Sequence, residues 1–261
     1  MAKAGDGVQW ILQGLQLLRK RPAELMSLSL LWMALAFICA MLGDFGALLW
    51  QLATPALCFI MLQACHNIDS GKKQDWNSLL QTVRAPLLKP MLLLGLFWVA
   101  AALLAGAILV LQLGQETIQS LSNPANQNKL PPGFDSAHFL QSVLLSLLLL
   151  CPFFMALWFT PGLVGWRRMG VAQALFFSMV SVWRALGAFL LYGLGMFLSL
   201  ILFTFAMQPP LMLAQALFGN VGVSMILLAS GNLFFALAFA SMYCCYRQFF
   251  GMPEAMPPAT E

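Results

Sequence analysis

Apolar residues form six stretches along the chain, separated by shorter segments that carry most of the polar and charged residues. A helix needs about 20 apolar residues to cross the bilayer core. The stretches cover residues 24–42, 46–65, 90–113, 139–164, 185–207 and 221–246. This pattern predicts six transmembrane helices, paired as three hairpins.

Three shorter segments between these stretches have the periodicity of amphipathic helices. The first has apolar residues at positions 8, 11, 12, 15 and 18, and the second at 76, 79, 80, 83 and 87. The third has them at 171, 174, 175, 179 and 182. Spacings of three and four place such residues on one face of a helix. Each segment precedes one predicted hairpin, so we expect three helices that lie in the membrane interface.

Tryptophan spacing suggests that these elements form an internal repeat. Trp32 follows Trp10 by 22 positions, and Trp98 follows Trp76 by the same interval. A coincidence between two apolar, Trp-rich segments is the alternative. Each predicted unit begins and ends on one side of the membrane, so the units are parallel. The predicted fold is an all-α membrane protein with six transmembrane helices, as three parallel repeats of an amphipathic interfacial helix plus a transmembrane hairpin.

These units define the expected domain organisation. Residues 1–251 form one membrane domain, with units at about 8–70, 75–166 and 170–248. A long outer loop covers residues 114–138, and Pro209-Pro210 opens the connection between the last two spans. The tail, 252–261, has three prolines in ten residues and is expected to be disordered on the cytoplasmic side.

Composition excludes a soluble protein. Hydrophobic residues make up 61% of the chain and charged residues 8%, with a mean hydropathy of +0.84. The interior of a soluble domain of 261 residues is too small to hide so much apolar surface. The net charge of +4 is too small and too dispersed for a nucleic-acid-binding protein, so no nucleic-acid partner is expected.

The distribution of basic residues predicts the orientation. Of the 13 Lys and Arg residues, all but Lys129 precede the first span, separate spans 2 and 3, separate spans 4 and 5, or follow span 6. Basic residues are enriched in the cytoplasmic segments of inner-membrane proteins. We therefore expect a multi-pass protein of the bacterial inner membrane with both termini in the cytoplasm.

No pattern in the chain indicates catalytic or cofactor chemistry. Ionisable residues at mid-span usually mark proton pathways and membrane enzymes, and the predicted spans carry none there. Cys65, His66 and Asp69 end the second span, but neighbouring side chains on a helix point about 100° apart. We expect them to face water rather than to form a catalytic set. The six Cys and 16 Met are scattered at core-like positions, which favours apolar packing over metal binding. The prediction is no enzyme and no cofactor.

Three polar features inside the spans allow two interpretations each. Asn232 is a candidate for an intramembrane polar contact, either as an interhelical hydrogen bond or as the lining of a path. Thr54-Pro55 and Thr160-Pro161 each lie in the second helix of a unit. Proline kinks a helix, which either opens a groove between hairpins or fixes a packing bend.

Basic residues next to the amphipathic helices are the candidate binding site. We name them the basic collar, and they are expected to contact lipid headgroups or a partner protein: Arg19, Lys20, Arg21, Arg84, Lys89, Arg167, Arg168 and Arg184. Each basic residue near an anionic membrane surface contributes roughly 1 kcal/mol of attraction. The alternative is that these charges only set the topology.

Several segments resemble an uncharacterised family of bacterial multi-span inner-membrane proteins. They are GVQWILQGLQLLR at 7–19 followed by Pro22, FTPGLVGW at 159–166, GVAQALFFS at 170–178, and Tyr192-Gly193. The chain is also similar, more distantly, to the membrane domain found ahead of some glycerophosphodiester phosphodiesterases. The resemblance implies a multi-span inner-membrane protein and carries over no catalytic residue.

The predicted function is a non-enzymatic inner-membrane protein that organises or supports an envelope process. It would act through membrane phospholipids, other membrane proteins or a second copy of itself. The alternative is a small transporter or channel for an uncharged or amphipathic solute, which would pass between the kinked hairpins.

Overall fold

All regular elements in the described part of the chain are helices. The computed structural model describes residues 3–81, 86–114 and 135–253, so most of the predicted outer loop and tail, and Arg84, lie outside it. The helices are α1 (Asp6–Lys20), α2 (Pro22–Met41), α3 (Gly43–Asp69), α4 (Trp76–Gln81), α5 (Leu88–Leu113), α7 (Ser136–Trp158), α8 (Thr160–Arg167), α9 (Val171–Trp183) and α10 (Leu186–Phe250).

Five of the described helical segments are long and apolar enough to cross a membrane. They are α2, α3, α5, α7 continued by α8, and α10. Most of their surface is apolar and not buried inside the protein, as expected for helices that face lipid. The chain is therefore a multi-pass helical membrane protein.

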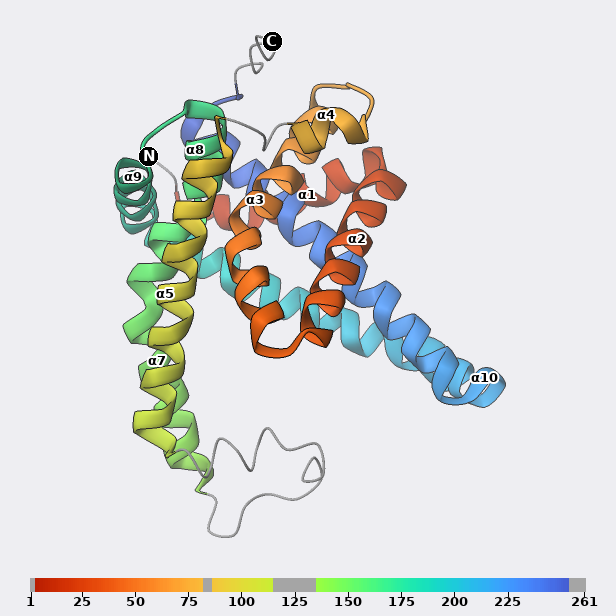
Figure 1. The fold of residues 1–261 in the computed structure, drawn as a ribbon. Helices are drawn as coiled ribbons and strands as arrows, with labels where there is room; N and C mark the ends of the chain where they lie inside the picture. The colour runs from red at the N-terminus through yellow and green to blue at the C-terminus, as the bar shows by residue number, and fades with distance from the viewer. Residues whose placement is uncertain (1–2, 82–85, 115–134, 254–261) are drawn as a thin grey trace.

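The last segment, α10, reverses direction at Gly219. Its 65 residues include one non-helical position, Gly219, with φ 62° and ψ −149°. Figure 1 shows the two arms of α10 running back along each other from this point. Glycine adopts positive φ at little steric cost, so the turn falls there. The prediction that Pro209-Pro210 opens the connection is wrong, because both prolines lie within helix and the first arm continues past them.

The short helices gather at one end of the molecule, which we call the basic end. In Figure 1 α1, α4, α8 and α9 lie at this upper end, and the long hairpins diverge from it. Helix α4 packs on α2–α3, α9 packs on α7–α8, and α1 packs on α10. Each of these three short helices thus packs mainly on helices other than the pair, or the reversing helix α10, that follows it in the sequence.

Two glycines allow α1 to approach α10 closely. A Cβ added at Gly7 would lie 2.2 Å from the carbonyl oxygen of Ala188, and one at Gly14 would lie 2.7 Å from the backbone nitrogen of Ser241. Between them Trp10 is fully buried and packs on aromatic rings of α10. Helix α1 therefore bridges both arms of α10.

Only part of the predicted apolar stripe of α1 is buried in the protein. The structure buries Trp10, Leu17 and Leu18, whereas Val8 and Leu12 are about half exposed. The close backbone approaches at Gly7 and Gly14 determine which face of α1 packs on α10. Val8 and Leu12 form an exposed apolar side of α1.

Helix α9 is anchored at the break between α7 and α8. The Ser178 hydroxyl donates to the Met155 carbonyl oxygen at 2.8 Å and accepts from the Phe159 amide at 2.9 Å. This hydroxyl therefore forms hydrogen bonds to two backbone groups where α7 ends at Trp158. Pro161 lies in the first turn of α8, which begins at Thr160, rather than bending a continuous helix, and there its missing N–H costs no hydrogen bond.

Candidate functional site

The structure divides the basic collar into free and internally bonded side chains. Four members are exposed and make no hydrogen bond or ion pair to a described residue: Arg19, Lys89, Arg168 and Arg184. Three others bond within the protein: Lys20, Arg21 and Arg167. The collar is therefore not a uniform belt of solvated charge.

Asp69, at the end of α3, organises one group of charges at the basic end. Its carboxylate pairs with Lys20 of α1 at 3.2 Å and with Arg247 of α10 at 2.5 Å. The Asp69 side chain is only 9% exposed, whereas those of Lys20 and Arg247 are 53% and 32% exposed. One carboxylate thus ties the ends of three helices together.

Two further side chains extend this group into the interior. The Tyr243 hydroxyl donates to Asp69 at 3.2 Å and lies 3.2 Å from Nδ1 of His66. Both His66 and the neighbouring Cys65 are buried, so the prediction that this helix end faces water is wrong. Tyr243 and Arg247 come from the far end of the sequence, which the local pattern around Asp69 does not reveal.

Asn232 connects the second arm of α10 to α2. Its side-chain amide donates to the Met26 carbonyl oxygen at 3.0 Å, and its oxygen accepts from the Ser29 hydroxyl. Asn232 and Ser29 are both buried. These contacts hold α10 against α2.

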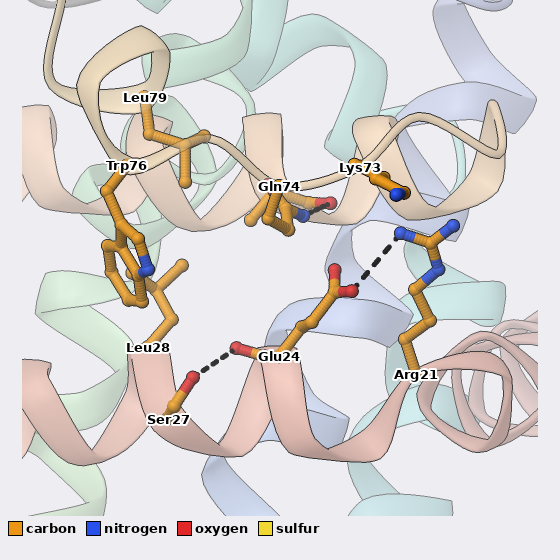
Figure 2. Close-up of a pocket in the computed structure, with 9 residues that line it drawn as sticks. Arg21, Glu24, Ser27, Leu28, Lys73, Gln74, Trp76 and Leu79 are labelled. Carbon is orange, nitrogen blue, oxygen red and sulfur yellow. Dashed lines mark hydrogen bonds and ion pairs between the residues drawn. The ribbon is translucent and has the colours of Figure 1, made fainter.

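A cavity of about 360 Å³ opens at the basic end between α2, the end of α3 and the segment that leads into α4. Figure 2 shows Arg21, Glu24 and Lys73 around its polar part, while Leu28 and Trp76 lie toward its apolar part. Only Arg21 belongs to the basic collar. We call this space the headgroup cavity.

Internal hydrogen bonds hold the polar wall of the headgroup cavity in place. Arg21 donates to the carbonyl oxygens of Gly71 at 3.3 Å and Lys72 at 3.0 Å, and to Glu24 at 3.1 Å. Gln74 donates to the Ala64 carbonyl oxygen at 2.7 Å. These bonds fix residues 71–74 over α2 and α3, so the cavity wall is a built feature.

An apolar groove adjoins the headgroup cavity. It lies between α2 and α3 beneath α4 and is lined by Leu, Ile, Met and Trp side chains. Leu28, Trp76 and Leu79 line both spaces. Polar and apolar surfaces therefore meet along one continuous wall.

Sequence analysis missed the other charged residues of this cavity. Glu24 is the one acidic residue in the first apolar helix, Pro22–Met41, and that position is the signal that could have identified it. Lys73 contributes only to the charge bias that predicts the orientation, and Gln74 fits no pattern, because a short polar turn has no periodicity. Among the described residues, no three His, Cys, Asp or Glu side chains are placed to hold a metal ion.

Comparison with known proteins supports the membrane location. The chain is similar to a probable inner membrane protein of Burkholderia thailandensis, with 28% identity over 258 residues that cover 98% of this chain and 94% of the relative. No protein-family model and no solved structure matches the chain. The similarity and the apolar helices support a multi-pass protein of the inner membrane, and do not extend to the phosphodiesterase-linked membrane domain.

Proposed function

We propose that this protein is a non-enzymatic inner-membrane protein that binds inner-leaflet phospholipid at its basic end and thereby organises or supports an envelope process. The headgroup cavity carries this proposal, since it places Arg21 and Lys73 above an apolar groove. A phospholipid has its polar and apolar parts in the same order, with phosphate at the water interface and hydrocarbon below. Other membrane proteins or a second copy of the chain would then meet the lipid-facing sides of the hairpins.

The proposed architecture has six spans in three parallel units. At 1.5 Å per residue, the helical length of α10 is about 100 Å, roughly three times the hydrocarbon core. Its reversal at Gly219 supports two crossings. The packing of α4, α9 and α1 supports a cyclic order, because each covers the preceding hairpin, with the third hairpin preceding the first.

In this architecture the basic end and both termini face the cytoplasm. A reporter that is active only in the cytoplasm should be active when fused to either terminus. A reporter that is active only in the periplasm should be inactive at both. An Asn220→Cys variant, altered beside the turn of α10, should react with a membrane-impermeant maleimide in intact cells. A Lys73→Cys variant is the matched control and should react only after lysis. A terminus found outside would contradict the orientation.

Removing the two cations of the headgroup cavity should release bound lipid. We expect Arg21→Gln with Lys73→Gln to lower phospholipid affinity roughly tenfold or more, because each forms charge-assisted hydrogen bonds to phosphate. The measurement is native mass spectrometry of the full chain in mild detergent, at several phospholipid concentrations. Lys73→Gln alone should show part of the loss without disturbing Arg21.

A double variant of exposed collar residues provides the control. Arg19→Gln with Arg168→Gln removes the same charge from side chains outside the cavity. It should weaken only the diffuse attraction to anionic lipid, which is greatest at low salt. Equal lipid retention by the cavity variant and this control would contradict the proposal.

A further inference from the structure

From the headgroup cavity we infer the class of lipid that it binds, an inference that rests on the proposed function. We propose that its occupant is a phosphoethanolamine lipid, with the phosphate on Arg21 and Lys73, the primary ammonium on Glu24, and one acyl chain along the apolar groove. Hydrogen-bonding groups of the cavity that remain unused within the protein determine which headgroup fits.

Positive donors remain available for one phosphate. The Arg21 guanidinium has five N–H groups, and its contacts in the protein are to Glu24 and two carbonyl oxygens. The Lys73 ammonium has three, and none bonds to a described residue. Figure 2 places both side chains at the same side of the cavity. A phosphate between them would receive donors from both.

Glu24 makes a purely anionic headgroup a poor fit. Its carboxylate lines the same cavity, and only Oε1 has a partner, Arg21 at 3.1 Å. Oε2 is buried without a hydrogen-bond partner, so the carboxylate has unused acceptor capacity in a partly dehydrated place. A second negative group against this carboxylate would be repelled, whereas a positive donor would be attracted.

A phosphoethanolamine headgroup meets both requirements. Two carbons separate its phosphate from a primary ammonium, so one headgroup can contact the cations and the carboxylate of a single cavity. Phosphatidylglycerol offers hydroxyl donors but no positive charge, and phosphatidylcholine offers a positive charge with no N–H donor. Charge complementarity and hydrogen bonding therefore both favour the primary amine.

The apolar groove accounts for the rest of the lipid. Leu28, Trp76 and Leu79 form the shared wall, so hydrocarbon leaving the headgroup cavity passes directly onto the groove. The groove has a volume of about 90 Å³, small enough for part of one chain rather than two. Helix α4 then lies over the chain near the glycerol, and the second chain stays in the bilayer.

The test compares phospholipids that share acyl chains and differ in headgroup. The full chain, delipidated in mild detergent, is titrated with phosphatidylethanolamine, its N-methyl and N,N-dimethyl derivatives, phosphatidylcholine and phosphatidylglycerol, and occupancy is measured by native mass spectrometry. We expect phosphatidylethanolamine to bind about tenfold more tightly than phosphatidylglycerol. Affinity should also fall with each added methyl group, because each removes or crowds a donor.

Variants separate this inference from the proposed function. Glu24→Gln should remove the preference, with weaker phosphatidylethanolamine binding and stronger phosphatidylglycerol binding, while Asp44→Asn at the opposite end of α3 should leave both unchanged. Equal binding of the two lipids by the wild type, or no response to N-methylation, would overturn the inference and leave phospholipid binding intact. If the Arg21 and Lys73 variants bind every lipid as the wild type does, the proposed function itself is wrong.

Discussion

Replacing Gly14 with leucine should detach α1 from α10 and lower the free energy of unfolding by about 3 kcal/mol. The expected effect is large because a Cβ at this position would lie 2.7 Å from the backbone nitrogen and 2.8 Å from the Cα of Ser241. A flexible side chain can move aside, but the backbone of a packed helix cannot. The helices must separate, and the burial of Trp10 is lost with them.

Gly193→Leu is the matched control for this variant. Gly193 lies in α10 with nothing within 4 Å of an added Cβ, so the same replacement meets no neighbour there. Both changes gain about 0.8 kcal/mol of helix propensity. Denaturant titration in mild detergent measures the difference, and maleimide labelling of the buried Cys245 thiol reports the detachment of α1. Equal stability of the two variants would show that α1 is not held by this contact.

Neutralising Asp69 should have the second-largest effect. We expect Asp69→Asn to lower the free energy of unfolding by about 2 kcal/mol, since it leaves Lys20 and Arg247 without their shared counter-ion. The value is smaller than for a fully buried pair because water screens both partners, which are partly exposed. Asparagine preserves the shape of the side chain, so the loss reports charge rather than packing.

Asp44→Asn tests whether any lost carboxylate has this effect. Asp44 is exposed in the first turn of α3, at the other end of the same helix. In the same denaturant titration, the free energy of unfolding of Asp44→Asn should lie within about 0.5 kcal/mol of the wild-type value.

A contrary outcome would be an Asp69→Asn variant that is as stable as the wild type yet loses its function in cells. That result would place chemistry at the end of α3 and contradict a role limited to lipid binding.

The amphipathic helices show what a local sequence pattern can predict and what it cannot. The third predicted segment, 171–182, matches α9 (Val171–Trp183), and the first lies within α1. The pattern located both helices because alternation between apolar and polar residues is local. For α1 it did not reveal the face that packs on α10, because hydropathy gives weight to Val8 and Leu12 and none to Gly7 and Gly14. The glycines bury their positions through backbone contact, which depends on what α10 presents there.

By itself the sequence determined that this is a helical membrane protein, where its apolar helices lie, and that its basic residues cluster between particular pairs of them. Those properties follow from the composition of short windows, since a bilayer selects for length and hydrophobicity rather than for a partner. Only the tertiary structure decided which long helices each short helix packs on and which charges meet. Packing of α10 on α3 brings Arg247 to Asp69, and the segment between α3 and α4 folds back over α2 to bring Lys73 to the cavity of Glu24. No local pattern carries that information.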